Sequence, residues 1–575
     1  MIRSAAAGVC LSLMISGVLS LSVDSRETAA PQRAVRRSLA LCAGEQQYVD
    51  QRKQLVEEAL HRLLINCSED SVPHIVLLAS GGGQRAAVSL VGSLYQMAQD
   101  GLLDSLLYLG GVSGSTWSMA SLYSDPEWSW NMDRAQSRLS GDGVELQDAL
   151  GWLNKTAAED GFSLSDVWGV LTSAGIMKQM DERRLSDEAN RNASNPYPIY
   201  SAVEKHCYSH GPIEAKWFEV SPHEAGFTEL DLFVNTSLLG SKFQMGDLLE
   251  KKPEMDMIKL QGVFGCALAH EELVVEFVPD WLRVGDSVNV PAQEYLRVYN
   301  TLHKLIGLTR MTVKDPAGLT QLDKLQKRLQ DQVSRNESAL LESKSLEERE
   351  ALFQRWGLDL VTTVTTWTES LEDGPFKALV SMLTKQVIPL ILKWEWGTTE
   401  NFLYKYQDST VPACLLMEER FQLVDAGALI NVGYPPFLGD KRDIDLIIAP
   451  EYSAGDMFET LTLARDYAAK VKKPFPVIDD RILEDRDWPK DCYVFDGKEN
   501  EPTIIYMPLF NRHNCKDAKQ FTENMDKFST FQRPFSQDMV ESLLATAKTN
   551  MKNHRETLLR EINKAVLRRQ NKRKS

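Results

Sequence analysis

Ser113 stands in a run of small residues whose types and spacing suit a nucleophile. The run reads Gly-Gly-Val-Ser-Gly-Ser at residues 110–115, after an apolar stretch at 102–109 and before a helix-like stretch at 118–123. A serine at a glycine-rich corner between a strand and a helix is lifted out of the sheet, where its hydroxyl can attack a carbonyl. The pattern therefore predicts Ser113 as the nucleophile of an acyl transfer. Because many loops contain Gly-x-Ser-Gly, further residues must support this prediction.

A second glycine-rich turn can supply the groups that stabilise the negative charge of such a reaction. Residues 80–83 read Ser-Gly-Gly-Gly and separate an apolar run at 75–79 from a helix-like run that begins at Arg85. Backbone N–H groups at a helix start attract anions, so we expect those of Gly82 and Gly83 to form an oxyanion hole. One such donor is typically worth roughly 3–4 kcal/mol. A P-loop fails because no Lys-Ser or Lys-Thr pair follows the glycines, whereas a plain tight turn remains an alternative.

The third candidate is Asp425, which follows the apolar run 421–424 and precedes Ala-Gly. It would lie at the carboxyl end of a strand, where open α/β sheets place their functional groups. The alternative is a purely structural role as the cap of a turn or helix. Ser113 and Asp425 together would provide a nucleophile and a general base.

The identity of the base distinguishes two mechanisms. In an α/β-hydrolase triad a histidine follows the aspartate in the chain, and only His513 and His554 do so here. His554 lies in a basic tail, and His513 lies in a loop that is unlike a triad loop. We therefore predict a Ser113–Asp425 dyad in which burial makes the carboxylate more basic. A Ser-His-Asp esterase that uses His513 is the alternative.

These residues need a sheet to position them. Strands are predicted at 75–79, 102–109 and 421–424, and helices are predicted from Arg85 onward and at 118–123. Strands that alternate with helices indicate an α/β fold. With 575 residues, 43% of them hydrophobic, the chain can bury a large core.

The three motifs, in this order, resemble those of the patatin and cytosolic phospholipase A2 hydrolases. Longer matches narrow the resemblance to the group IV cytosolic phospholipases, and among them to the gamma type, which lacks a C2 domain. The resemblance covers about residues 70–540. The matching runs are Ser-Gly-Gly-Gly-Gln-Arg-Ala (80–86), Gly-Val-Ser-Gly-Ser-Thr-Trp (111–117), Trp-Glu-Trp-Gly-Thr-Thr (394–399) with Asn-Phe (401–402), Asp-Ala-Gly (425–427), Asp-Leu-Ile-Ile (445–448), Ser-Ala-Gly (453–455) and Pro-Phe-Pro (474–476).

The resemblance implies a three-layer patatin-like α/β hydrolase, with a central mixed, mainly parallel sheet between helices and a cap or lid inserted at about 270–393. It also implies hydrolysis of the sn-2 ester of glycerophospholipids at a membrane surface, through an acyl-serine intermediate, with lysophospholipase and transacylase side activity. Arg85 and Arg442 match two family arginines that contact the lipid phosphate, although either could be a surface salt-bridge residue. A catalytically silent lipid-binding protein is a further alternative, against which the intact motifs argue.

Composition limits the other partners. A net charge of −16 argues against nucleic acid as a partner, because the phosphates would be repelled. Eight cysteines lack the spacing of a zinc site or of a disulfide framework. No metal or cofactor is expected, and protein partners are not indicated.

Four parts of the chain are predicted. Residues 1–25 hold an uncharged, apolar stretch after Arg3, which is typical of a signal peptide or anchor. Residues 26–70 would form an N-terminal helical arm, with an amphipathic helix at 45–64, and residues 71–540 the catalytic domain. Residues 541–575 would form a basic amphipathic helix that binds an anionic membrane or lies solvated. Too few residues precede residue 70 for a calcium-binding C2 domain, so calcium-independent action is expected.

The location of the protein is left with two alternatives. The resemblance implies a cytosolic enzyme that associates with intracellular membranes, whereas the N-terminal hydrophobic segment would direct the chain to the secretory route. Asn-x-Ser/Thr sites occur at Asn66, Asn154, Asn192, Asn235 and Asn336. A chain of this length contains a handful by chance, so the sites alone do not decide.

Overall fold

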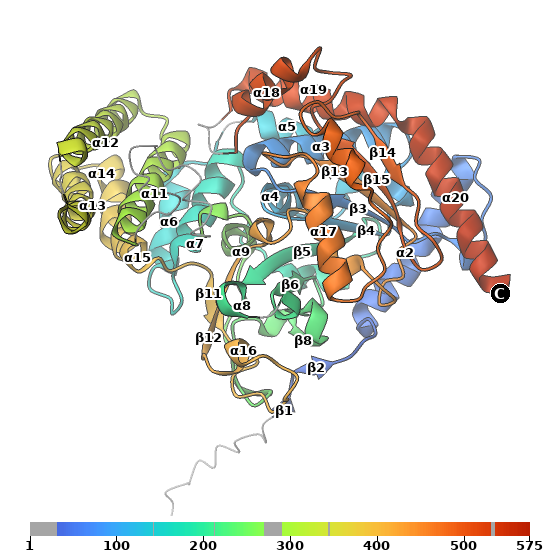
Figure 1. The fold of residues 1–575 in the computed structure, drawn as a ribbon. Coiled ribbons are helices and arrows are strands. Elements are labelled where there is room, and N and C mark those ends of the chain that lie inside the picture. The colour runs from blue at the N-terminus through green and yellow to red at the C-terminus, as the bar shows by residue number, and fades with distance from the viewer. Residues whose placement is uncertain are drawn as a thin grey trace, which may run out of the picture. The chain divides into compact units, whose positions relative to one another are not determined.

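A computed structural model describes residues 32–141, 143–211, 213–269, 290–342, 345–530 and 535–574. The chain divides into two units, residues 1–33 and residues 34–575. The described part of the first unit is the short strand β1 (Gln32–Arg33). The second unit contains one large sheet with helices on both sides of it (Figure 1).

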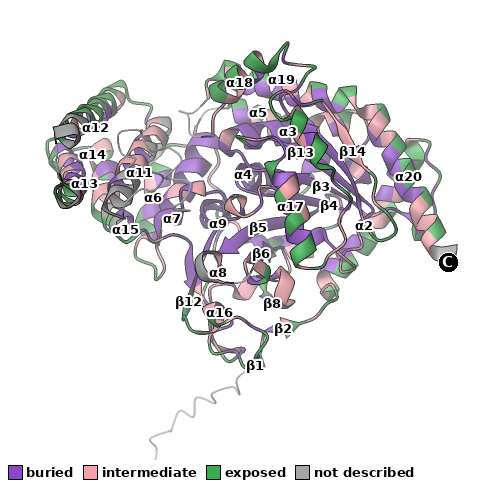
Figure 2. Cartoon of the chain, viewed as in Figure 1, coloured by how far each residue is buried: buried purple, intermediate pink, exposed green. Residues whose placement is uncertain are grey.

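Five neighbouring strands form the parallel centre of this sheet. In spatial order they are β15 (Thr503–Pro508), β13 (Leu446–Glu451), β3 (Ile75–Ala79), β4 (Tyr108–Gly111) and β5 (Tyr197–Glu204). Every residue of these strands is buried (Figure 2). Strands covered on both faces are apolar along their whole length, which is why 75–79 could be recognised as a strand from the sequence.

Antiparallel strands extend the centre on both sides. β14 (Tyr493–Phe495) pairs with β15 at one edge. From β5 the sheet continues through β6 (Trp217–Val220), β7 (Glu224–Phe227), β8 (Leu232–Asn235) and β2 (Arg36–Arg37). The prediction of a mixed sheet with a parallel centre between helices is confirmed.

The helices next to the sheet include most of those that the sequence predicted. The central helix α3 (Gly83–Gln99) packs against α4 (Gly114–Tyr123), α5 (Met132–Ser140) and α19 (Gln537–Asn553). α2 (Ala43–Arg62) and α9 (Met257–Phe264) pack against β5. α17 (Glu459–Lys470) follows β13.

Five described helices fill most of the predicted insertion at 270–393, of which residues 270–289 lie outside the described residues. They are α11 (Val290–Thr312), α12 (Pro316–Glu342), α13 (Leu346–Glu369), α14 (Pro375–Met382) and α15 (Ile388–Lys393). α11 packs on α7 (Leu164–Leu171), and α14 packs on α6 (Leu146–Thr156). Figure 1 shows the five helices gathered to one side of the sheet.

The strand predicted at 102–109 is shorter and begins later. Leu103–Ser105 forms a 3-10 turn, and β4 begins only at Tyr108. The leucines before β4 are nevertheless buried. A short apolar run in a sequence indicates that its residues are buried. It does not show whether they form a strand or a turn.

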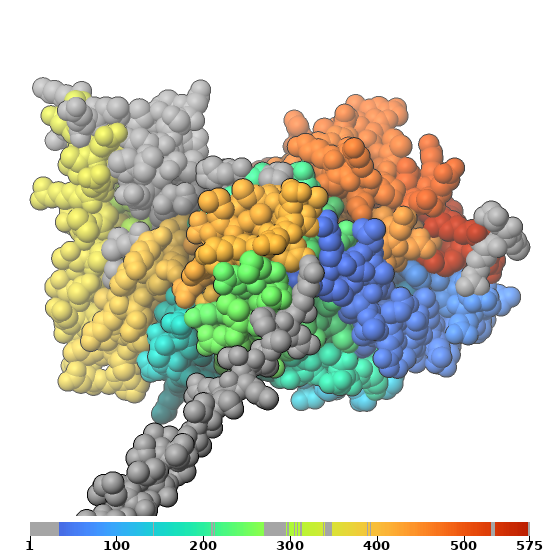
Figure 3. All heavy atoms as spheres, turned by 90° about the horizontal axis from the view of Figure 1, so that it is seen from below, coloured from blue at the N-terminus to red at the C-terminus, as the bar shows by residue number. Residues whose placement is uncertain are grey.

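The C-terminal helix α20 (Arg555–Lys574) packs on other elements of the second unit. Its apolar residues Leu558 and Ile562 are buried, and Arg569 Nη1 lies 3.0 Å from Asp443 Oδ2. Figure 3 shows this end of the chain, in red, beside the N-terminal helical segment, in blue. Protein therefore covers the apolar side of the helix that the sequence suggested for membrane binding. No helix in the described part of the chain has the length and hydropathy to span a membrane.

One disulfide was not anticipated. Cys207 in α8 (Lys205–His210) is bonded to Cys414 in α16 (Ala413–Leu416), with Cα atoms 5.6 Å apart. The sequence indicated no disulfide framework and did not point to this pair. The two cysteines are 207 residues apart, so their spacing carries no signal of the pairing.

Candidate active site

The loop between β3 and α3 is pressed against the predicted nucleophile. Gly82 has a φ of +148°, a conformation that residues with a side chain rarely adopt. The Gly81 N–H donates to the carbonyl oxygen of Asn431 over 2.9 Å. A methyl group added to Gly81 would lie 2.7 Å from Ser113 Cβ. The loop therefore leaves no space for a side chain on the side that faces Ser113.

Ser113 forms the turn between β4 and α4. Its φ of 54° and ψ of −125° are unusual for a residue with a side chain, as expected for a nucleophile at a strained strand-to-helix corner. A methyl group on the next residue, Gly114, would lie 2.0 Å from the carbonyl oxygen of Gly83. The first turns of α3 and α4 therefore meet beside Ser113, where both helix dipoles favour negative charge.

The register of β5 explains how Asp425 reaches Ser113. β4 runs parallel to β5 and ends with Gly111 opposite Tyr200. β12 (Arg420–Asp425) runs antiparallel to β5 and ends with Asp425 opposite Ala202. Because β6 occupies the other edge of β5 over these residues, β4 and β12 share one edge and meet end to end.

The Asp425 carboxyl is buried, with 1% of the residue exposed, and the Ser113 side chain is among the groups that act on its pKa. Its Oδ1 also accepts a hydrogen bond from the Gly427 N–H at 2.8 Å. Burial raises the pKa of Asp425 to about 6, although the Ser113 side chain and the Gly427 N–H act in the opposite direction. Asp425 also caps the turn Ala426–Ala428, so the structural role considered for it from the sequence is present.

The predicted oxyanion donors lie at the start of α3. Gly82 is the N-cap of this helix and Gly83 is its first residue. The first N–H groups of a helix have no partner within the helix, so they can bind a developing negative charge. The structure thus brings together Ser113, Asp425, Gly82 and Gly83.

Arg85 lies next to this loop but points into the protein. Its Nε donates to the carbonyl oxygen of Tyr452 at 2.7 Å, its Nη1 donates to that of Phe528 at 2.5 Å, and its Nη2 donates to Thr530 Oγ1 at 3.3 Å. Burial lowers the pKa of Arg85 to about 10. These hydrogen bonds link the start of α3 to Tyr452, which directly follows β13, and to the segment that contains Phe528 and Thr530.

Arg442 lies in a buried ion cluster. Its guanidinium binds Glu45 and Glu219, each with a nitrogen–oxygen distance of 2.8 Å, and also donates to the Pro436 carbonyl oxygen. It lies 5.9 Å from the ring of Tyr108, at the amino end of β4, whereas Ser113 follows the carboxyl end. The structure does not bring Arg442 to the dyad. Arg442 forms ion pairs, as the alternative of a salt-bridge residue predicted. These ion pairs are buried and do not lie at the surface.

The histidines considered for a triad lie elsewhere. His513 Nδ1 is 2.8 Å from Asp491 Oδ2, and the His513 side chain is 66% exposed. His554 Nε2 lies 3.2 Å from the same oxygen. Both histidines therefore face Asp491 and not Asp425, which favours the dyad.

A polar network behind the glycine loop was missed from the sequence. Asn431 Nδ2 donates to Ser453 Oγ at 2.6 Å, and the Ser453 N–H donates to Glu451 Oε1 at 2.6 Å. Glu451 also accepts a hydrogen bond from the Tyr506 hydroxyl, and burial raises its pKa. Because Asn431 also binds Gly81, this network supports the loop. The only signal in the sequence was that Ser453 lies in a run that matches the family.

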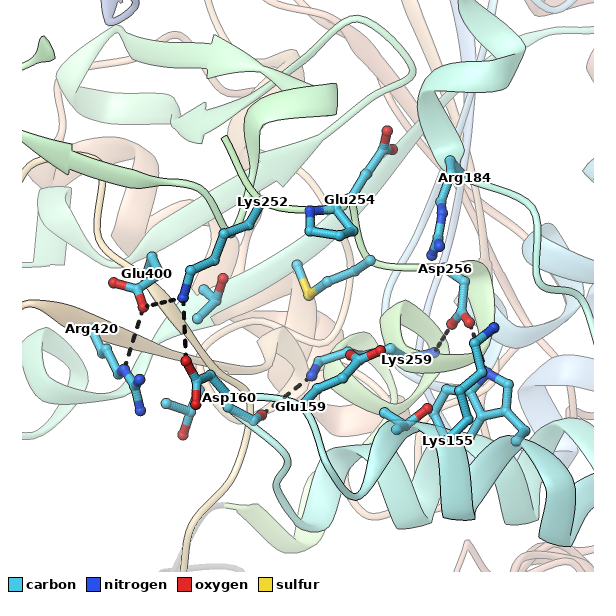
Figure 4. Close-up of a pocket in the computed structure, with 18 residues that line it drawn as sticks. Lys155, Glu159, Asp160, Arg184, Lys252, Glu254, Asp256, Lys259, Glu400 and Arg420 are labelled. Carbon is cyan, nitrogen blue, oxygen red and sulfur yellow. Dashed lines mark hydrogen bonds and ion pairs between the residues drawn. The ribbon is translucent and has the colours of Figure 1, made fainter. Parts of the chain in front are cut away.

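A separate polar cavity of about 350 Å³ is lined by ten charged residues, five of each sign (Figure 4). Lys252 Nζ lies 3.1 Å from Glu400 Oε1, and Lys259 Nζ lies 3.0 Å from Asp166 Oδ1. Its charges balance one another, and the residues of the dyad do not line it. The described residues contain no cluster of three or more potential metal ligands.

Comparison with known proteins identifies the family of this chain. Residues 75–277 match the family model of the lysophospholipase catalytic domain. Human cytosolic phospholipase A2 gamma is 31% identical over 533 residues, which cover 90% of this chain and 94% of the relative. This chain belongs to the cytosolic phospholipase A2 family. The mouse gamma enzyme is 29% identical over 549 residues, which cover 91% of each chain.

The fold of the family is also found among solved structures. Human GIVD cytosolic phospholipase A2 superposes with a TM-score of 0.65 at 22% identity, over 94% of this chain and 67% of that chain. Its complex with methyl gamma-linolenyl fluorophosphonate gives a TM-score of 0.61. The predictions of the family, of the α/β fold and of a phospholipase-type enzyme are confirmed. The relatives are named as cytosolic.

Proposed function

We propose that this chain is a calcium-independent phospholipase A2 that hydrolyses the sn-2 ester of glycerophospholipids with a Ser113–Asp425 dyad. The observation that carries the proposal is that a buried aspartate, whose pKa burial raises to about 6, interacts with a serine in a strained turn. At neutral pH this carboxyl is ionised, and it is more basic than an ordinary aspartate. A base with these properties can activate a serine without a histidine.

In the acylation step, Asp425 accepts the proton of the Ser113 hydroxyl while Oγ attacks the carbonyl carbon of the ester. The N–H groups of Gly82 and Gly83 stabilise the negative charge on the carbonyl oxygen. Asp425 then passes the proton to the oxygen of the departing lysophospholipid. An acyl-serine ester remains.

In the deacylation step, Asp425 takes a proton from a water molecule, which attacks the acyl-serine. As the bond to Oγ breaks and the fatty acid leaves, Asp425 returns the proton to Ser113 Oγ. A lysophospholipid that enters in place of water would accept the acyl group instead. Lysophospholipase and transacylase activities are therefore natural side reactions of the same dyad. All groups that the mechanism needs are protein groups, so it has no step for calcium.

The substrate is presented by a phospholipid membrane surface, and the helices α11–α15 would act as the cap over the site. Phosphate binding by Arg85 and Arg442 stays a prediction, and the proposal does not depend on it. Protein acceptors already bind both guanidinium groups, and a phosphate would have to compete with them.

The test measures fatty acid release from vesicles of sn-2-labelled phosphatidylcholine in the presence of EGTA. Wild type and His513→Ala are expected to release fatty acid at similar rates. Ser113→Ala and Asp425→Ala are expected to lose at least about a thousandfold in rate, as removal of a nucleophile or its base does in serine hydrolases. Release that survives Asp425→Ala, or that His513→Ala abolishes, would contradict the dyad.

A catalytically silent lipid-binding protein is the second candidate. A serine-reactive fluorophosphonate distinguishes it, because labelling at Ser113 requires an activated hydroxyl. We expect labelling of the folded wild type at Ser113 and none of Ser113→Ala. Folded wild-type protein that binds vesicles but takes up no label would support the silent alternative.

A further inference from the structure

A disulfide holds together the two strands that position Asp425. Cys207 lies in α8, directly after β5, and Cys414 lies in α16, shortly before β12. β12 pairs with β5, so the bond covalently closes this strand pair. Disulfides persist in the secretory pathway and outside the cell, and they are rare in the cytosol, where thiols are kept reduced.

Four of the five Asn-x-Ser/Thr sites lie on the surface. The exposed asparagines are Asn66 after α2, Asn154 on α6, Asn192 after the 3-10 helix Leu185–Asn190, and Asn235 at the end of β8. A site of this kind receives a glycan only in the secretory pathway, and a surface position leaves room for it. The four sites come from different elements of the second unit.

Hydrogen bonds at two of these sites involve the oxygen of the asparagine. Ser194 Oγ donates to Asn192 Oδ1 at 2.9 Å, and Ser237 Oγ donates to Asn235 Oδ1 at 2.6 Å. A glycan is attached to the amide nitrogen, so these contacts are compatible with it.

The fifth site provides a contrast within the same chain. Asn336 lies in α12 with 8% of the residue exposed, and its Nδ2 donates to the Tyr295 hydroxyl at 3.2 Å. A glycan on this nitrogen would have to displace the packing of α12. Asn336 therefore serves as a matched control, since it has the sequence of a glycosylation site without the exposure.

We propose that this chain matures in the secretory pathway, where Asn66, Asn154, Asn192 and Asn235 receive N-linked glycans and the Cys207–Cys414 disulfide forms. The apolar stretch at residues 5–23, after Arg3, has the composition of a segment that directs a chain to this pathway. This location differs from that of the relatives named as cytosolic.

Both modifications have defined co-reactants. In each glycosylation, the amide nitrogen forms a bond to the first sugar of a lipid-linked oligosaccharyl diphosphate. The bond between that sugar and the diphosphate breaks, and the amide loses one proton. In the oxidation, the two thiols lose two protons and two electrons to the disulfide of a thiol oxidoreductase.

The test uses the full chain, produced in animal cells and analysed by gel mobility before and after treatment with peptide-N-glycosidase F. The enzyme is expected to increase the mobility of the wild type. Each of Asn66→Gln, Asn154→Gln, Asn192→Gln and Asn235→Gln is expected to remove one step of the shift. Asn336→Gln is expected to leave the shift unchanged, because its nitrogen is buried.

Two results would overturn the proposal. One is a wild-type mobility that the glycosidase does not change. The other comes from peptide mapping without reduction, in which we expect one linked peptide that contains both Cys207 and Cys414. Full alkylation of both thiols in unreduced protein would show that the chain had not passed through an oxidising compartment.

Discussion

Two buried carboxyl groups, on the two strands that flank β5, differ in their pKa. Burial raises the pKa of Asp425, beside Ser113, to about 6. Burial acts in the same direction on Glu219, but the charges of Arg442 and Lys441 outweigh it and lower the pKa to about 2. The same desolvation thus yields a base where hydrogen bonds are the only opposing influence, and an ion pair where cations are present.

The charged forms of Asp425 and Glu219 therefore affect the stability of the fold in opposite ways. For Asp425, the difference between a pKa of about 6 and the ordinary 3.8, at about 1.4 kcal/mol per pH unit, corresponds to a cost of about 3 kcal/mol at neutral pH. For Glu219, the depressed pKa means that its charged form is favoured in the folded state. The fold accepts an unfavourable charge at Asp425 and neutralises the charge of Glu219 with cations.

The largest effect is expected from Asp425→Asn. Fatty acid release should fall by at least about a thousandfold, because the base is lost. The melting temperature at neutral pH should rise, because a buried charge is removed. The stability that protonated Asp425 contributes is present below about pH 4 and is lost as pH rises through about 6, so the difference in Tm should shrink at pH 4. A variant that melts below wild type at neutral pH would contradict the assigned cost.

Arg442→Gln is expected to lower the stability of the fold. It removes the guanidinium that binds both Glu45 and Glu219 and leaves Glu219 with Lys441, and removal of one partner from a buried ion pair typically costs about 3–5 kcal/mol. Denaturant unfolding measures this loss, and Arg442→Lys, which retains the charge, should lose less. If instead Arg442 binds the lipid phosphate, Arg442→Lys would raise KM while stability stayed near that of wild type.

A smaller effect is expected from Cys414→Ser. Loss of the bond between the segments next to β5 and β12 should lower the stability of the fold by about 2–4 kcal/mol. Activity should fall at temperatures where wild type is still fully active, because β12 carries Asp425. Cys492→Ser, at a cysteine outside the disulfide, is the matched control. Equal thermal inactivation of the two variants would show that the disulfide does not secure the catalytic strand.

The parts of the site that could be predicted from the sequence are local. The strand at 75–79, the glycine loop, the Ser113 corner and Asp425 each consist of an apolar run followed directly by a turn. Such patterns are encoded within a few residues, so one sequence was enough to find them.

The parts that could not be predicted depend on residues far apart in the chain. Arg442 is 397 residues from Glu45 and 223 residues from Glu219, so nothing in its neighbourhood indicated a buried ion cluster. The Cys207–Cys414 disulfide joins segments whose proximity is a result of β5–β12 pairing. Tertiary structure decided these contacts, and it also decided that α20 packs on the protein.

The most direct test of the account is the rate at which a fluorophosphonate labels Ser113, measured from about pH 4.5 to about pH 9 in wild type, Asp425→Asn and His513→Ala. Because Asp425 acts as a base only when ionised, the wild-type rate should rise with an apparent pKa of about 6 and then level off. His513→Ala should give the same profile, and Asp425→Asn should label slowly at every pH. A rise that persists in Asp425→Asn and disappears in His513→Ala would contradict the Ser113–Asp425 dyad.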